Sequence, residues 1–322
     1  MNLSLAAAGA VYAAHENIPA RAAVPIVAAF LAQFSFYLVP GFPELRQLLE
    51  RRFSPFQLAG LLLAAALTPY LIYSLPTEVF QFPALLKLAG VCATPAFVFV
   101  LAPARGARLC WQDLVVGGSI VATVLSGIFR QIYHSPIAGL RLEVMGQIML
   151  IALGSMAFLS FRRLQGSGYQ LRMSWADWKT GIRQFLLFLP VGAALGWGVG
   201  FVRFSGFPSR QFDLWMYPFL AAGTFLGMYA VVALAEEFFF RGVLQNLATA
   251  SLGRPLPAQA IASIAFGIIH LPFRGFPNWR FALLAALAGW FYGQAYRQRQ
   301  SVVASSITHA LVNTAWRLLP PG

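Results

Sequence analysis

The chain has 322 residues, of which 59% are hydrophobic and only 10% are charged. Soluble domains carry roughly 25% charged residues, so this composition excludes an ordinary soluble enzyme and predicts a polytopic membrane protein. The formal net charge of +13 lies mostly between the apolar segments. We therefore expect contact with anionic lipid and no nucleic-acid partner.

Apolar segments follow one another along the whole chain, and a helix needs about 20 apolar residues to cross a bilayer. The expected spans are residues 22–41, 57–75, 82–102, 114–129, 143–161, 185–202, 215–240, 256–270, 281–296 and 301–319. Because three of them are short, we predict an all-α transmembrane helical bundle with eight to ten spans. The apolar residues before the first span lack a basic flank, so we expect no cleaved signal peptide.

The composition becomes more polar just before the sixth expected span. Trp175 and Trp178 recur there at helical spacing, with arginine and lysine on the opposite side. This pattern predicts an amphipathic helix near 172–184 that lies in the membrane interface. We therefore expect an N-terminal accessory transmembrane region, 1–184, and a second region, 185–322, that holds nearly all the polar residues of the apolar segments.

Two adjacent glutamates, Glu236 and Glu237, stand within an apolar segment. A carboxylate at bilayer depth costs about 2.5–3.5 kcal/mol and usually faces a bundle interior or a water-filled cavity. Neighbouring residues diverge by about 100° on a helix, so the two side chains cannot readily share one task. Glu237 stands four residues before Arg241, which favours an ion pair that holds the helix end. Glu236 remains free for chemistry.

Two of the four histidines also lie in apolar segments. His270 follows Phe266 by four residues, and His309 precedes Asn313 by four. Residues four apart share one face of a helix, so we expect Phe266 to pack beside His270, and His309 and Asn313 to project together.

The remaining candidate residues are given no functional role. His15 and His134 fall in polar junctions and are expected at the surface, and Cys92 and Cys110 show no metal-ligand spacing.

A carboxylate, two imidazoles and an amide suit the hydrolysis of an acyl bond. A glutamate and a histidine can activate a water as general base. A second histidine and an asparagine can donate hydrogen bonds to the oxyanion. Ser305 and Ser306 lie near His309 but are expected only to pack, which leaves water as the attacking group.

Other functions are compatible with the same residues. Glu236, His270 and His309 could hold zinc, although their spacing is not His-Glu-x-x-His and they come from three helices. A proton-coupled transporter could use buried Glu and His as a relay, but it predicts matching breaks in two halves that are not visible here. A non-enzymatic immunity protein is a third alternative.

Three motifs resemble the signatures of the CAAX prenyl protease 2 and bacteriocin-processing family of intramembrane glutamic endopeptidases. Glu-Glu-x-x-x-Arg is found at residues 236–241, Phe-x-x-x-His at 266–270 and His-x-x-x-Asn at 309–313. The motifs occur in the family's order, and the resemblance covers about residues 215–319.

The resemblance implies a membrane-embedded protease site without a cofactor, and it makes 185–322 the expected protease core. Glu236 and His270 are then expected to activate the water, and His309 and Asn313 to stabilise the oxyanion. The resemblance also implies a membrane-associated protein or peptide as substrate. The Ala-rich and Arg-rich composition is typical of bacterial proteins, so we expect a multi-pass protein of the bacterial inner (cell) membrane.

Overall fold

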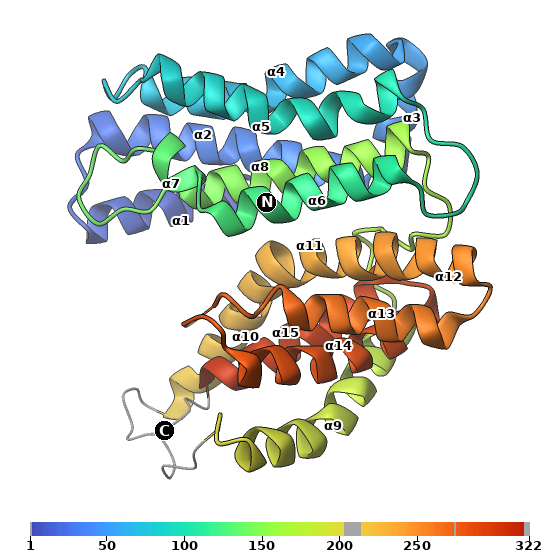
Figure 1. The fold of residues 1–322 in the computed structure, drawn as a ribbon. Helices are drawn as coiled ribbons and strands as arrows, with labels where there is room; N and C mark the ends of the chain where they lie inside the picture. The colour runs from blue at the N-terminus through green and yellow to red at the C-terminus, as the bar shows by residue number, and fades with distance from the viewer. Residues whose placement is uncertain (1, 203–213, 274, 319–322) are drawn as a thin grey trace. The chain divides into compact units, whose positions relative to one another are not determined.

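The computed structural model describes residues 2–202, 214–273 and 275–318 (Figure 1). These residues form helices and no strand, which confirms the predicted all-α class. They divide into two compact units. One comprises Met1–Gly106 with Cys110–Arg163, and the other Ala107–Leu109 with Leu164–Gly322. This division lies ahead of the expected boundary at residue 184, and the functional assignment of 1–184 and 185–322 stays a prediction.

The first unit surrounds one central helix, α8. Its helices are α1 (Asn2–His15), α2 (Ala20–Leu38), α3 (Pro43–Arg52), α4 (Pro55–Ser74), α5 (Phe82–Leu101), α6 (Trp111–Ser126), α7 (Phe129–Ile132) and α8 (Glu143–Met156), which continues as a π-helical turn, Ala157–Phe161. Of the α8 span, 78% is buried, against 28–39% of the other apolar spans. Gly146 makes part of this packing possible, because a side chain there would overlap the Phe129 ring.

A buried ion pair ties α6 to the end of α8. Arg162 Nε lies 2.8 Å from Asp113 Oδ1, and the two side chains are 4% and 1% exposed. Arg162 also donates to the Gly106 carbonyl at 2.8 Å. These bonds satisfy charges that would be costly to bury alone.

The second unit contains the paired glutamates and both histidines of the predicted site. Its helices are α9 (Trp175–Gly198), α10 (Tyr217–Gly227), α11 (Leu234–Glu237), α12 (Asn246–Leu252), α13 (Pro255–Ile268), α14 (Trp279–Arg299) and α15 (Val302–Leu318). Two π-helical segments, Met228–Ala233 and Phe238–Gln245, join α10, α11 and α12 into one rod. Helices α14 and α15 pack on each other and on α9, while α13 and α15 both contact the rod (Figure 1).

The turn between α14 and α15 is held by the segment that precedes α9. Gln300 ends α14 with a left-handed φ of 50°, and the Gly168 carbonyl accepts a hydrogen bond from Val302 N at 3.0 Å. Gly168 has φ +64°, and a Cβ there would collide with the Gln300 carbonyl. Only glycine combines this conformation with this close approach.

Five helices among the described residues are long and apolar enough to cross a membrane: Ala20–Gly41, Pro55–Ser74, Phe82–Leu101, Glu143–Phe161 and Tyr217–Leu252. The polytopic class is confirmed, but the expected eight to ten spans exceed this count. Expected spans 114–129 and 256–270 correspond to shorter apolar helices. The end of the last expected span, residue 319, lies outside the described residues.

Polar side chains explain most of the difference in span count. The expected spans 185–202, 281–296 and 301–319 are helical, but α9, α14 and α15 are not among the five. These helices carry Asp, Arg, Gln, Ser and His residues, several of which are buried within the unit. Polar side chains that face the interior of a membrane protein lower the mean hydropathy of their helix, so such a helix is not counted as an apolar span.

Two expected helix boundaries are wrong. The separate helix near 172–184 and the span that follows form one helix, α9, which begins at a capping box between Ser174 and Asp177. The rod also continues to Leu252 instead of ending near 240. Arg241 was expected to hold the end of this helix, but its side chain is fully buried inside the unit.

Candidate active site

Glu236 and Glu237 stand where the rod changes its helical winding. They end the single α-helical turn of α11, between the two π-helical segments. A π-helical turn carries an extra residue, which rotates the side chains that follow, and such turns are frequent at functional sites. Within α11 the two adjacent side chains diverge by about 100°, so the two glutamates enter different surroundings.

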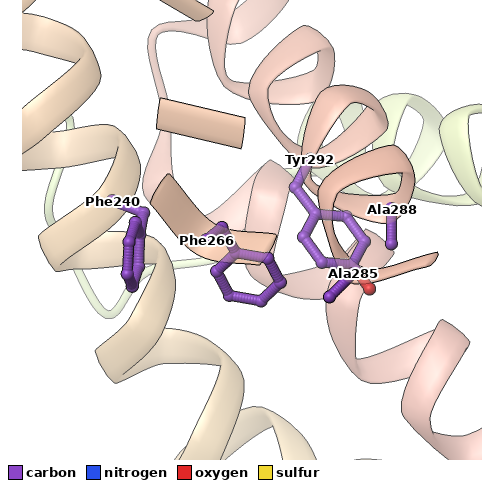
Figure 2. Close-up of a cluster of buried hydrophobic side chains, with 5 residues drawn as sticks. All are labelled: Phe240, Phe266, Ala285, Ala288 and Tyr292. Atoms are coloured by element: carbon purple, nitrogen blue, oxygen red, sulfur yellow. The ribbon is translucent and has the colours of Figure 1, made fainter. Parts of the chain in front are cut away.

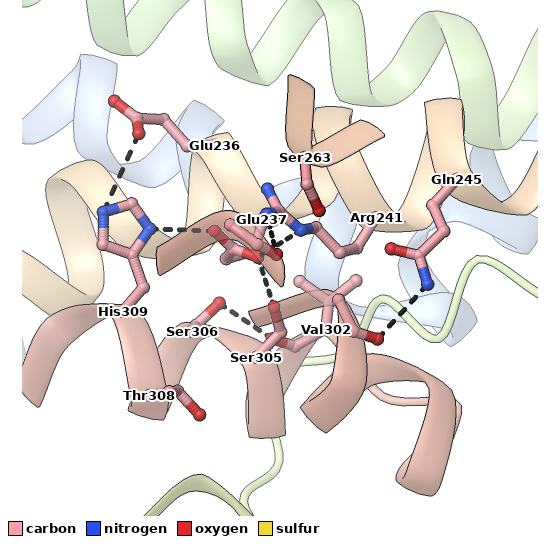
Figure 3. A network of polar contacts seen from close by, with 12 residues as sticks. Glu236, Glu237, Arg241, Gln245, Ser263, Val302, Ser305, Ser306, Thr308 and His309 are labelled. Carbon is pink, nitrogen blue, oxygen red and sulfur yellow. Dashed lines mark hydrogen bonds and ion pairs between the residues drawn. The ribbon is translucent and has the colours of Figure 1, made fainter. Parts of the chain in front are cut away.

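Glu237 lies at the centre of a buried polar network (Figure 3). Its Oε2 lies 3.2 Å from Arg241 Nε, and both side chains are 0% exposed. Its Oε1 accepts a hydrogen bond from His309 Nδ1 at 2.8 Å. The Ser305 hydroxyl donates to Oε2. The predicted pair with Arg241 is present, but Glu237 also contacts a predicted catalytic histidine.

Glu236 approaches the same histidine from the other side. Its Oε2 lies 3.8 Å from His309 Nε2, and its side chain is 32% exposed. Figure 3 shows the imidazole of His309 between the two carboxylates, with one ring nitrogen directed at each. The adjacent glutamates thus address opposite nitrogens of one ring.

Arg241 is held by aromatic rings as well as by Glu237. Its guanidinium lies 4.9 Å from the centre of the Phe266 ring and 5.5 Å from that of Tyr292. Its Nη2 donates to the Gly289 carbonyl at 2.7 Å. A Cβ on Gly289 would lie 2.9 Å from Nη2, so glycine leaves room for the guanidinium.

Phe266 links the two histidines. Its ring centre lies 4.6 Å from that of His270 and 5.6 Å from that of His309. It belongs to a buried cluster with Phe240 and Tyr292 (Figure 2). The predicted contact with His270 is present, and the contact with His309 is additional.

The hydrogen bond of His270 determines which of its nitrogens is free. Nδ1 lies 2.7 Å from the carbonyl oxygen of Phe266. A carbonyl only accepts, so Nδ1 carries the hydrogen, and the neutral ring presents a lone pair on Nε2. This tautomer suits a proton acceptor.

Asn313 follows His309 by one turn on α15 and is half-buried. Side chains four residues apart on a helix share a face. The structure thus brings Glu236, Glu237, His309 and Arg241 into direct contact and connects His270 to them through Phe266. The role of Asn313 rests on its spacing from His309 along α15.

Two residues contribute contacts that sequence reasoning missed. Ser305 was expected only to pack, but its buried hydroxyl donates to Glu237. Its position four residues before His309 places it on the same face, which was an available signal. Tyr292 stacks on His309 with ring centres 4.5 Å apart. It stands in an aromatic-rich helix, and no pattern distinguishes it there.

The described side chains contain no group of three His, Cys, Asp or Glu residues arranged to hold a metal ion. Glu236, His270 and His309, the three residues named for the zinc alternative, are all among the residues described. Nδ1 of His309 contacts Glu237, and Nδ1 of His270 contacts the Phe266 carbonyl.

Comparison with known proteins identifies the same part of the chain. Residues 218–315 match the family model described as type II CAAX prenyl endopeptidase Rce1-like. This region is Rce1-like. The match confirms the resemblance drawn from the three motifs and supports, in general terms, a CAAX-type membrane protease. It covers just under a third of the chain, and a search of curated proteins and of solved structures gives no match.

Proposed function

We propose that the protein is an intramembrane endopeptidase that uses Glu236 and His270 to activate water and His309 and Asn313 to stabilise the oxyanion. The observation that carries this proposal is the position of His309 between the two glutamates, at 2.8 Å from Glu237 and 3.8 Å from Glu236. Glu236 is the more exposed of the two, with a side chain 32% exposed, which suits contact with a water and a substrate.

The first step is attack by water. The water oxygen bonds to the carbonyl carbon of the peptide while one water proton passes to the Glu236 carboxylate. His270, with its Nε2 lone pair, accepts a hydrogen bond from the same water. Glu236 thus acts as the general base, and His270 helps to orient the water.

The second step is collapse of the tetrahedral intermediate. With a proton on Nε2, His309 donates to the oxyanion, beside the Asn313 amide. The proton held by Glu236 passes to the amide nitrogen, the C–N bond breaks, and the products are a carboxylic acid and an amine. Glu237 acts through His309 and is a positioning residue.

The substrate is proposed to be a membrane-associated protein or peptide. The description of the matching family names CAAX prenyl endopeptidases, so a prenylated CAAX-type peptide is the first probe to test. We also propose the bacterial inner membrane as the location, from the Ala-rich and Arg-rich composition.

The decisive experiment compares wild-type protein with Glu236→Gln in liposomes, using a farnesylated fluorogenic CAAX-type peptide. We expect turnover by the wild type and a loss of about 100-fold or more in the variant. Glu143→Gln is the matched control, because Glu143 belongs to the other unit and pairs only loosely with Arg130 at 3.8 Å. Equal turnover by Glu236→Gln and the wild type would reject the assigned role.

A different substrate requires a second measurement. Protein termini are compared in membranes from cells that express wild type or Glu236→Gln. Termini found only with the wild type identify the cleaved protein, and identical sets of termini in both would contradict an endopeptidase.

A further inference from the structure

Tyr292 lies flat against the imidazole of His309. The two ring centres are 4.5 Å apart and the ring planes differ by 13°. Tyr292 is 2% exposed and belongs to α14, whereas His309 belongs to α15. This is a closer and more nearly parallel contact than that of His309 with Phe266, which is edge-on at 5.6 Å and 88°.

The polar contacts of His309 are made by its two nitrogens, at 2.8 Å to Glu237 and 3.8 Å to Glu236, and the ring of Phe266 meets it edge-on. Contacts at the two nitrogens constrain a tilt of the ring about the line that joins them less than a ring packed flat on its face does. Such a tilt would turn the N–H bond at Nε2, which must stay directed at the Glu236 side for the proposed reaction. A flat aromatic surface against one face prevents that tilt.

We propose that Tyr292 is a positioning residue that holds the His309 imidazole in the orientation required for catalysis. This inference rests on the proposed function, in which His309 Nε2 serves the oxyanion. Tyr292 acts through His309 and is not itself required to touch the substrate. The stack also places the face of the tyrosine ring against the imidazole.

The aromatic ring of Tyr292 makes three contacts with the site: the stack on His309, an edge contact with Phe266 at 5.9 Å, and the Arg241 guanidinium at 5.5 Å. The positioning role is assigned to this ring. Phenylalanine reproduces these contacts, whereas leucine fills similar space without a π-face. The two substitutions therefore separate stacking from hydrophobic packing.

Tyr296 supplies a matched control. It is on the same helix, one turn later, is 3% exposed and donates to the Gly166 carbonyl at 2.8 Å. Tyr296→Leu removes an equally buried ring from α14 without removing the stack on His309. A purely structural effect of losing a tyrosine from α14 would appear in this variant too.

The first test needs no substrate. Protein with isotope-labelled histidine is studied by NMR, and the His309 signals are assigned by their loss in His309→Gln. We expect His309 ring protons to be shifted upfield by the ring current of Tyr292 in the wild type, in Tyr292→Phe and in Tyr296→Leu. The shift should disappear in Tyr292→Leu. Unshifted His309 protons in the wild type would overturn the proposal.

The second test measures turnover of the farnesylated peptide, or of the substrate that the terminus comparison identifies. We expect Tyr292→Leu to lower kcat by about 10- to 100-fold with little change in KM, because a small misplacement of a catalytic group has effects of this size. Tyr292→Phe and Tyr296→Leu should keep wild-type kcat after correction for the folded fraction.

The outcomes separate this inference from the proposed function. Wild-type kcat in Tyr292→Leu, or an equal loss in Tyr292→Phe, overturns the positioning role while the protease assignment stands. If the upfield shift is present but wild-type protein and Glu236→Gln produce the same protein termini, the proposed function is what fails, and the role in catalysis falls with it.

Discussion

Glu237 accepts a hydrogen bond from His309 at 2.8 Å, although 72 residues separate them in the chain. The same carboxylate forms the ion pair with Arg241, so one buried group connects a helix-stabilising contact with a histidine of the site. A change at Glu237 is therefore expected to affect both the stability of the protein and its catalytic activity.

Glu237→Gln should lower both stability and turnover. The change leaves Arg241 buried without its anionic partner, for which we expect a loss of about 3–5 kcal/mol in the free energy of unfolding. It also weakens the bond that orients His309, so kcat of the folded fraction should fall. Unfolding in detergent and peptide turnover measure the two effects.

Ser305→Ala is the matched comparison for Glu237→Gln, because it removes one hydrogen bond and keeps the carboxylate. We expect a stability loss of only about 1 kcal/mol. A Glu237→Gln protein that is less stable but fully active per folded molecule would show that Glu237 has a structural role alone.

Gly289→Ala should disturb the Arg241 site from a neighbouring helix. The added Cβ would lie 2.9 Å from Arg241 Nη2 and 3.3 Å from the Phe266 ring. We expect a loss of about 1–3 kcal/mol from overpacking. Gly223→Ala, in α10, meets no atom within 4 Å and should be neutral or stabilising by up to about 1 kcal/mol. Equal effects in thermal unfolding would contradict the close packing at Gly289.

Asp177, which lies outside the five apolar spans, should make stability depend on acid pH. Burial raises the pKa of its carboxyl, but hydrogen bonds from Ser174 and the charge of Arg299 outweigh burial, so the pKa lies below its ordinary value. Its contribution is therefore present above the unfolded pKa of about 3.9 and is lost as the pH falls through the folded pKa.

Asp177→Asn tests this dependence in unfolding experiments between pH 7 and pH 3. We expect the variant to be less stable than wild type by about 1 kcal/mol at pH 7, a typical value for a lost helix cap. The difference should shrink below about pH 4. A difference that stays constant over the whole range would contradict the role of the ionised carboxylate.

Chelation distinguishes water activation by Glu236 from the zinc alternative. Because Glu236 and His270 can serve as the base without a metal, we expect turnover to be unchanged after treatment with 1,10-phenanthroline and dialysis. The measurement is repeated after adding Zn²⁺. Loss of turnover on chelation and its return with zinc would establish the metal mechanism instead.

The amino-acid pattern was sufficient for the fold class and for the region of the chain that holds the candidate site. Low charge and repeated apolar segments predicted an all-helical membrane protein, which the helices and the five apolar spans confirm. The Glu-Glu-x-x-x-Arg, Phe-x-x-x-His and His-x-x-x-Asn motifs lie within the region that matches the Rce1-like family. These are local properties, because composition and spacing along one helix can be read from the chain.

Helix ends were less predictable from the sequence. A charged residue usually indicates that an apolar helix has ended, but a buried and paired charge can lie in the middle of one. The pair of Glu237 and Arg241 was expected at the end of a helix, but it lies buried inside the unit and the helical rod continues to Leu252. The polar residues after Trp175 likewise suggested an interfacial helix separate from the next span. They form the first turns of α9, which runs unbroken to Gly198.

Relationships between helices were decided only when the chain packed. Residue spacing places Glu237 and Arg241 on one face, but it contains no information on how α15 is rotated against the rod or α14 against α15. That rotation directs Glu237 at His309 and lays Tyr292 flat on the imidazole. The relative rotation of these helices depends on the simultaneous packing of many side chains, and on the space that glycine leaves at position 289.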